Sequence, residues 1–260
     1  MKIIYWNANK NTEIKLICEM LLENIPDILF LSEINESFLN SNSLALKSIG
    51  YKIYPNPGCE RVKIIIAGNT IISLGLQNKF FTSVLTQDGL YIISVHFPSQ
   101  MYNHMDGQKY NLRNFRNNID GIIGSSNTTP ILIIGDMNVN PYEPAMVNYD
   151  GFMASNSLKS RETIKYIEEY RETYYNPTWR LYTEPNFPGT KKFPRPSGSS
   201  FDIIEFHFLD QVVISNNLKN KIVIDELKLI KETTNFKLYN KRYNRIDYSD
   251  HLPLQYEFIY

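Results

Sequence analysis

Apolar residues gather in short runs along the chain, and these runs predict β-strands. Several runs are apolar at almost every position, which is typical of strands that are covered on both faces. Because many runs follow one another directly, as at residues 62–96, the pattern argues against a strictly alternating parallel barrel. The predicted strands span Lys2–Trp6, Ile28–Ser32, Val62–Ala67, Thr70–Leu74, Phe80–Leu85, Leu90–His96, Ile131–Asp136, Asp210–Ser215 and Pro253–Ile259.

Three segments between these runs have the spacing of apolar positions that predicts amphipathic helices. They are Thr12–Asn24, Tyr110–Ile123 and Glu162–Thr173, and Thr12 is a candidate N-cap for the first. Strand runs that outnumber the helices predict an α/β (α+β) fold, a four-layer sandwich of two packed mixed β-sheets flanked by helices.

Length and composition indicate one globular domain over residues 1–260. Hydrophobic residues make up 43% of the chain and charged residues 21%, values that exclude wholesale disorder and a coiled coil. Residues 176–200 hold five of the thirteen prolines, which suits either a long functional loop or a linker. Strand-like runs lie on both sides and need partners to form a sheet, so we interpret this segment as a loop within the domain.

Charge and cysteine content limit the partners and the location that we expect. The 27 basic and 27 acidic residues cancel, so a phosphate-binding surface has to be local. No apolar run approaches the roughly 20 residues of a membrane span, and the run after Lys2 is too short for a secretory signal. The cysteines Cys18 and Cys59 favour a reducing cytoplasm, and no feature indicates an obligate protein partner.

Polar side chains stand at or beside the ends of several apolar runs. Strand ends that rim one side of a sheet form a crevice, so these side chains can converge there. A single such residue usually only starts a turn or caps a helix, but a set with complementary chemistry favours a site. The set comprises Asn7, Glu33, His96, Asp136, Asn138, Asp250 and His251.

The chemistry of this set favours a divalent cation and a phosphoester. Glu33 and Asp136 are carboxylate donors and the two asparagines are neutral ones, a combination that suits Mg²⁺ and does not suit zinc. His251, beside Asp250, supplies an acid–base group that titrates near neutral pH. These groups meet the needs of in-line attack on a phosphodiester: activated water, charge neutralisation and leaving-group stabilisation.

Six motifs follow one another in a fixed order from residue 6 to residue 253. They are WNAN (Trp6–Asn9), LSE (Leu31–Glu33), SVHFPS (Ser94–Ser99), IGDMN (Ile134–Asn138), LDQVVIS (Leu209–Ser215) and SDHLP (Ser249–Pro253). Together they resemble the endonuclease/exonuclease/phosphatase superfamily, the metal-dependent phosphoesterases that include DNase I and exonuclease III types. The stretch NPTWRLY at residues 176–182 also resembles a segment of a bacterial branch.

The resemblance implies Mg²⁺ as cofactor, with Mn²⁺ as a substitute. Glu33 resembles the principal metal ligand of the family. Asn7 would support the metal and the scissile phosphate, and Asp250 would assist at the metal side.

The resemblance also implies catalytic roles. Asp136 resembles the residue that orients or deprotonates the attacking water, and Asn138 would hold a phosphate oxygen. His251 would contact the phosphate as base or transition-state stabiliser. His96 looks like the second histidine of DNase I-like members, an acid or electrophile near the leaving group.

Two aspartates compete for the family position that buttresses the terminal histidine. Asp210 is followed by aliphatic residues and a serine, as in the family's strand, whereas Asp202 would belong to a degenerate copy of the motif. We favour Asp210, although Phe208 and Leu209 replace the usual preceding Arg-Ile.

Two groups of residues are candidate nucleic-acid contacts, with Asn9 of the first motif as a further one. On a helix, Arg113 and Arg116 with Lys109 would form a basic stripe, and a solvated helix face is the alternative. Aromatic residues interleaved with cations in the long loop can stack on bases, and plain loop packing is the alternative. The loop group comprises Trp179, Arg180, Tyr182, Lys191, Lys192 and Arg195.

These features favour a Mg²⁺-dependent phosphodiesterase, above all a nuclease acting on DNA. The same core with different loops would suit a phosphatase or phosphodiesterase that acts on a small-molecule, nucleotide or lipid phosphate. A third hypothesis is a non-catalytic nucleic-acid-binding module. Every expected catalytic position holds a competent residue, which disfavours that third hypothesis.

Overall fold

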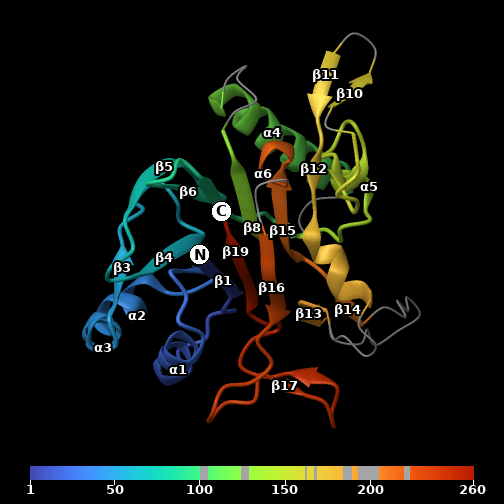
Figure 1. Ribbon diagram of the computed structural model, residues 1–260. Coiled ribbons are helices and arrows are strands. Elements are labelled where there is room, and N and C mark those ends of the chain that lie inside the picture. The colour runs from blue at the N-terminus through green and yellow to red at the C-terminus, as the bar shows by residue number, and fades with distance from the viewer. Residues whose placement is uncertain are drawn as a thin grey trace.

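Two mixed β-sheets stack at the centre of the molecule, and helices lie on the outside of each (Figure 1). The structure is a computed structural model that describes residues 1–99, 105–123, 129–161, 163–166, 169–183, 189–192, 205–219 and 223–260. The α+β arrangement of two large mixed sheets with helices is confirmed.

The first sheet has six strands and contains both ends of the chain. Its order is β16 (Val223–Leu229), β19 (Leu254–Ile259), β1 (Lys2–Asn7), β2 (Ile28–Ser32), β4 (Val62–Ala67) and β3 (Tyr51–Tyr54). Strand β1 pairs parallel with β2 and antiparallel with β19. The last strand of the chain therefore lies beside the first, which brings the end of β1 close to the segment that precedes β19.

The second sheet has seven strands. Its order is β5 (Ile72–Asn78), β6 (Phe81–Thr86), β7 (Tyr91–His96), β8 (Ile131–Asp136), β15 (Asp210–Ser215), β12 (Tyr174–Tyr175) and β9 (Ala154–Ser155). Strands β7 and β8 are parallel, and β15 is antiparallel to β8. As a result the ends of β7 and β8 and the start of β15 share one edge of this sheet.

The alternation of side chains along β8 shows why its run is apolar throughout. Leu132 and Ile134 belong to the core that both sheets share, whereas Ile131 and Ile133 belong to a second core that includes Phe115 of α4 (Met105–Ile123). A strand that is covered on both faces needs apolar residues at every position.

Helices cover the outer faces of both sheets. Helices α1 (Ile14–Asn24), α2 (Glu36–Ser41) and α3 (Ser43–Ser48) pack on the first sheet, and α4 with α5 (Pro144–Val147) packs on the second (Figure 1). Two short helical turns complete the set, α6 (Asn216–Lys219) and the 3₁₀ helix η1 (Pro177–Thr183). The N-cap of α1 is Glu13, whose carboxylate accepts from Lys15 N at 3.2 Å, so the prediction of Thr12 is wrong.

The predicted helix at Glu162–Thr173 is wrong. These residues form an antiparallel pair, β10 (Thr163–Tyr166) and β11 (Glu169–Glu172). β-Branched and aromatic residues such as Ile164 and Tyr170 favour extended backbone. The helix prediction gave too much weight to the charged residues between them. Two further short pairs are β13 (Lys191–Lys192) with β14 (Phe206–His207), and β17 (Tyr239–Asn240) with β18 (Arg245–Ile246).

The proposed loop at residues 176–200 is described in two pieces, residues 176–183 with η1 and residues 189–192 with β13. Residues 184–188 and 193–200, Arg195 among them, lie outside the described residues. The single domain stays a prediction. Within the described part of the chain, no helix is both long and apolar enough to span a bilayer.

Candidate active site

Strand ends from both sheets deliver polar side chains to one place. In the second sheet, Asp136 at the end of β8 lies between its register partners His96 on β7 and Asp210 on β15. In the first sheet, Asn7 ends β1, and Glu33 directly follows β2. Asn7 Nδ2 donates to Glu33 Oε1 at 3.0 Å and to Asp136 Oδ2 at 3.3 Å, so one amide joins the two sheets at this point.

The glycine before Asp136 has a steric reason. Gly135 has a φ of +146°, and a Cβ at this position would lie 2.1 Å from the carbonyl oxygen of Val95 on β7. Glu33 and Asn138 also have left-handed backbone, with φ of 51° and 53°. Left-handed backbone costs free energy in residues other than glycine. It persists where the surrounding structure enforces it, and it clusters at functional sites.

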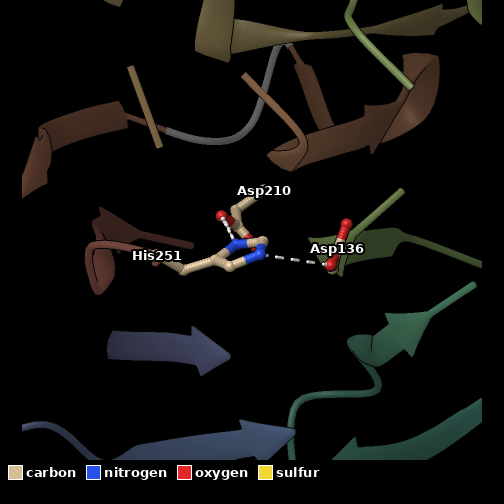
Figure 2. A group of neighbouring side chains, drawn as sticks. All are labelled: Asp136, Asp210 and His251. Atoms are coloured by element: carbon tan, nitrogen blue, oxygen red, sulfur yellow. Dashed lines mark hydrogen bonds and ion pairs between the residues drawn. The ribbon is translucent and has the colours of Figure 1, made fainter. Parts of the chain in front are cut away.

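His251 and Asp210 form a buried hydrogen-bonded pair (Figure 2). His251 Nδ1 lies 2.7 Å from Asp210 Oδ2. The His251 side chain is 0% exposed and the Asp210 side chain is 1% exposed. Burial alone would lower the pKa of His251, but the carboxylates of Asp210 and Asp136 raise it above the ordinary value. Asp210 thus contacts the terminal histidine as expected, and its competitor Asp202 lies outside the described residues.

Hydrogen bonds from three other segments hold this pair. The Trp6 indole donates to the carbonyl oxygen of His251 at 3.1 Å, and Ser249 Oγ accepts from His251 N at 3.0 Å. Ser249 Oγ also donates to the carbonyl oxygen of Asn7 at 2.7 Å. Asp210 N donates to Thr190 Oγ1 at 3.0 Å. The imidazole position is thus fixed from β1, from the loop before β19 and from the loop before β13.

Glu33 and His96 lie on the opposite side of Asp136. His96 Nε2 is 3.4 Å from Glu33 Oε1 and 3.9 Å from Asp136 Oδ2. Hydrogen bonds from His96 and then from Asn7 lower the pKa of Glu33 to about 2, against the opposing effect of burial. The carboxylate of Glu33 is consequently ionised at any physiological pH.

Asp136 lies between the two histidines. Its Oδ2 is 3.9 Å from His251 Nε2, the same distance as from His96 Nε2 (Figure 2). Burial and the charge of Asp210 raise the pKa of Asp136. Its Oδ1 accepts from the backbone N of Asn138 at 2.8 Å, and the Asn138 amide donates to the carbonyl oxygen of Phe97 at 2.7 Å.

Lys191 contacts Nε2, the nitrogen of the His251 ring that does not face Asp210. Its Nζ lies 2.9 Å from His251 Nε2 and 2.9 Å from Asp250 Oδ2. Burial would lower the pKa of Lys191, but Asp250 raises it. Asp250, predicted at the metal side, instead pairs with this lysine.

A cavity of about 710 Å³ opens in front of these groups. Carboxylates outnumber cations in its lining, with Glu33, Glu60, Asp136 and Glu143 against Arg61 and Lys191. Its other polar lining residues are His96, Ser99, Asn138, Asn140 and His207. An acidic lining would repel a phosphate unless another cation were present.

The architecture matches solved structures along the whole chain. Danio rerio TDP2 in complex with a single-strand DNA product matches with a TM-score of 0.61 and 15% identity, over 100% of this chain and 99% of that one. The human Nocturnin catalytic domain with bound sulfate gives 0.60 and 16%, over 100% and 94%. The 3′-5′ exonuclease NExo from Neisseria meningitidis gives 0.60 and 16%, over 100% of both chains.

The chain has the fold of the endonuclease/exonuclease/phosphatase superfamily. No protein-family model and no curated protein matches the sequence. At these identities the likeness establishes the superfamily fold, and the chemistry has to be argued from the residues of this chain.

The superfamily fold implies a metal ion, and the donor set beside the cavity fits one. Glu33 and Asp136 offer carboxylate oxygens, and the Glu33 side chain is 35% exposed. Asn7 turns its Nδ2 toward both carboxylates, so its amide orients them and its Oδ1 accepts from Asn9 N. Hard oxygen donors with room for water ligands suit Mg²⁺ or Mn²⁺. The excess of carboxylates in the cavity lining also favours a divalent cation, because such an ion would balance their negative charge.

Asp136, Asp210 and His251 also have ligand atoms within 4.8 Å of one another, a spacing that would let them hold a metal ion. Two contacts count against this. The Nδ1 nitrogen of His251 is engaged by Asp210, and its Nε2 nitrogen faces the cationic Lys191. These two contacts leave the oxygen atoms of Glu33 and Asp136 as the donors that remain open to an ion.

The prediction that Arg116 belongs to a basic stripe on α4 that contacts nucleic acid is wrong. Arg116 is fully buried, where it bonds Asp120 and the carbonyl oxygens of Phe152 and Glu172 and lies 4.7 Å from the Tyr174 ring centroid. Its guanidinium is therefore a structural group under the β10–β11 hairpin and cannot contact nucleic acid. Arg113 is exposed, but it does not line the cavity.

The loop candidates separate into two places. Lys191 lines the cavity, and Lys192 follows it on β13. Trp179 packs against Tyr142 and Tyr182 and lines a second cavity of about 470 Å³, and Arg180 is exposed beside it on η1. Asn9 is exposed, and its backbone N donates to Asn7 Oδ1 at 3.1 Å, so it orients that amide.

Sequence reasoning missed several residues that shape the site. Asn140 Nδ2 lies 2.9 Å from His207 Nδ1, and both residues line the cavity. His207 lies on β14, and the local sequence does not show that it faces the cavity. Thr190 and Trp6 were also missed as residues that hold the site, because the local sequence does not show that a hydroxyl or an indole faces a motif residue. Asn140 was the exception, since it lies two residues after the GD-x-N motif.

Proposed function

We propose that the protein is a metal-dependent phosphodiesterase, a nuclease that hydrolyses DNA. The observation that carries the proposal is the position of Asp136, which lies in one cavity between the ionised Glu33 and the Asp210–His251 pair. Residues at this cavity can therefore activate a water, hold a cation and donate a proton to the phosphate.

Glu33 would hold the metal ion, with Asn7 and Asp136 beside it. The ion, when bound, would neutralise charge on the phosphate and polarise its oxygen atoms. Mg²⁺ is the proposed ion, and Mn²⁺ offers the same octahedral oxygen chemistry.

Asp136 orients the attacking water and accepts its proton. Asn138 N and Asn7 Nδ2 fix its two carboxylate oxygens, so the side chain keeps one orientation. Burial and Asp210 raise its pKa, which makes it a stronger base than an exposed aspartate. As the water oxygen bonds to phosphorus, the bond from phosphorus to the leaving oxygen breaks.

His251 and Lys191 together would bind a phosphate oxygen. Lys191 Nζ can donate to His251 Nε2 only when that nitrogen carries no proton, whereas the raised pKa of His251 favours the protonated ring. A phosphate oxygen between the two nitrogens would accept from both and remove this conflict. Asp210 keeps the proton on Nδ1 and stabilises the imidazolium.

His96 would serve the leaving oxygen. Its Nε2 faces Glu33 and Asp136, and its Nδ1 is buried without a hydrogen-bond partner among the residues that the structure describes. A protonated ring at this position can donate to the departing alkoxide, while Glu33 stabilises the imidazolium.

DNA is the proposed substrate for two reasons. Two proteins with this fold, TDP2 and NExo, have structures with single-strand DNA product and with a product DNA hairpin. In this chain, Lys192 supplies a cation beside the active site, and Trp179 with Arg180 supplies an aromatic ring and a cation at the second cavity. Both cysteines are free, in keeping with a cytoplasmic location.

Incubation with labelled DNA and RNA, in Mg²⁺, Mn²⁺ or EDTA, tests the proposal. We expect metal-dependent cleavage of DNA that Asp136→Asn reduces about 10³-fold or more. Asp88→Asn, which makes the same change at an exposed turn, is the control and should cleave like the wild type. Cleavage by Asp136→Asn at the wild-type rate, with contaminating nucleases excluded, would refute the mechanism.

A phosphatase or phosphodiesterase acting on a small phosphate is the second candidate. The volume of about 710 Å³ supports it, because it lies within the range of small-ligand sites. Cyclic nucleotides and inositol phosphates should be included with the nucleic acids. Turnover of one of them far above that of DNA would favour the second candidate, and binding without turnover of any phosphoester would favour a non-catalytic module.

A further inference from the structure

The segment from Lys231 to Tyr248 has a charge unlike that of the whole chain. It holds five cationic residues and two carboxylates, although the chain has no net charge. The segment lies between β16 and the SDH motif and contains the β17–β18 pair, which Figure 1 shows projecting at the end of the molecule where β13 lies. The cations are Lys231, Lys237, Lys241, Arg242 and Arg245.

The tip of this hairpin exposes a cluster of arginine and tyrosine. Arg242 and Arg245 each lie 5.4 Å from the ring centroid of Tyr243, which is 59% exposed. Lys241 and Arg242 are exposed and make no ion pair with any residue that the structure describes. Aromatic and guanidinium planes beside free cations are what an unpaired base and its phosphate require.

The base of the segment is fixed to the rest of the protein. The Glu19 carboxylate on α1 accepts from Thr233 Oγ1 at 2.9 Å and from Asn235 N at 3.0 Å. Asn11 Nδ2 donates to the carbonyl oxygen of Tyr248 at 2.7 Å. A hairpin that is held at its base loses less conformational entropy when a ligand binds to its tip.

Cations connect the hairpin to the candidate active site. Lys192 Nζ donates to the carbonyl oxygen of Asn244 in the hairpin, and Lys192 N donates to the carbonyl oxygen of Asp250 at 3.0 Å. The preceding residue, Lys191, contacts His251. A strand whose phosphate lies at His251 would pass Lys191 and Lys192, which pair with Asp250 and Glu205, and reach the exposed cations Lys241 and Arg242.

We propose that the hairpin at residues 237–248 binds single-stranded nucleic acid, as an extension of the active-site cavity. Its cations neutralise phosphates, and bases stack on the Tyr243–arginine cluster. Stacking requires an unpaired base, so the surface selects single strands over duplexes. The inference rests on the proposed nuclease function, since it assigns the path of that substrate.

Binding of a fluorescein-labelled oligothymidylate, measured by anisotropy in EDTA over a series of salt concentrations, tests the inference. EDTA prevents metal-dependent hydrolysis, so the result does not depend on turnover. We expect Lys241→Gln/Arg242→Gln to weaken binding at least about tenfold and to reduce the salt slope by about 1.4, because each lost phosphate contact removes about 0.7. Tyr243→Leu should weaken binding about tenfold with an unchanged slope.

The control is Lys47→Gln/Lys52→Gln, which removes the same charge from exposed positions on α3 and β3. It should bind like the wild type. Equal affinity of the two double variants would overturn the inference, as would wild-type binding too weak to detect. Tighter binding of a duplex of the same length would overturn the selection of single strands. If binding behaves as expected but no phosphoester is cleaved, the proposed enzyme function fails and the binding surface stands.

Discussion

The two halves of the candidate site differ in burial and in how many of their polar atoms have hydrogen-bond partners within the protein. On the closed half, Asp210 and His251 are buried, bonded to each other and held by Trp6, Ser249 and Thr190. On the open half, the carboxylate of Glu33 is 35% exposed and faces the cavity. In the proposed mechanism, the closed half holds a proton and a phosphate oxygen, and the open half binds the cation.

The pKa directions follow the same division. Hydrogen bonds lower the pKa of Glu33 to about 2, whereas buried carboxylates raise the pKa of His251. The open half is therefore negative at neutral pH, whereas in the closed half the imidazolium of His251 balances the carboxylate of Asp210. Asp136 lies between the two halves, and in the proposed mechanism it acts on a water that both halves flank.

The largest expected effect comes from the closed half. Asp210→Asn keeps the shape of the side chain but removes the charge that orients and supports the imidazolium, so kcat should fall about 10³- to 10⁴-fold. The Mg²⁺ concentration for half-maximal activity should stay the same. Steady-state cleavage across a Mg²⁺ titration measures both quantities, and a large shift in the Mg²⁺ requirement would show that the halves are not separate.

A smaller effect of a different kind is expected from the open half. Glu33→Gln should raise the Mg²⁺ concentration for half-maximal activity about 10- to 100-fold, because a metal ligand loses its charge. Added Mg²⁺ should restore much of kcat, which it should not do for Asp210→Asn. A Glu33→Gln protein with the wild-type Mg²⁺ dependence would place the ion elsewhere.

The smallest effect should come from the residues around each half. Trp6→Phe removes the indole bond to the His251 carbonyl and should cost about 1 kcal/mol in the free energy of unfolding, with a fall in kcat of a few fold. Asn9→Gly, exposed on the open half and compatible with the left-handed backbone at this position (φ 43°), should change the free energy of unfolding by less than about 0.5 kcal/mol. Denaturant unfolding with parallel assays gives both values, and an equal loss in the two variants would contradict the preorganisation of the closed half.

The strands were the most predictable part of the fold. Runs such as Ile28–Ser32, Val62–Ala67 and Ile131–Asp136 have the observed bounds, because burial on both faces leaves an unmistakable local pattern. Thr70–Leu74 was displaced, since β5 covers Ile72–Asn78, and the predicted helix at Tyr110–Ile123 begins earlier, at Met105. Element ends depend on contacts that a local pattern does not contain.

The site was predictable where its residues stand at strand ends, and less so elsewhere. The structure brings Asn7, Glu33, His96, Asp136 and His251 together, as the strand-end argument expected. The environment of Arg116 was not predictable, because its partners Phe152 and Glu172 are distant in sequence. The basic hairpin at residues 237–248 was missed because it has no apolar run and no motif.

Paramagnetic broadening of the histidine ring signals by Mn²⁺ tests the division of the site most directly. In protein labelled with ¹⁵N-histidine, the account predicts that Mn²⁺ broadens the His96 ring signal, because His96 Nε2 lies 3.4 Å from Glu33 Oε1, and that Glu33→Gln abolishes this at the same Mn²⁺ concentration. A His96 signal that stays sharp in the wild type, or broadening that persists unchanged in Glu33→Gln, would contradict it.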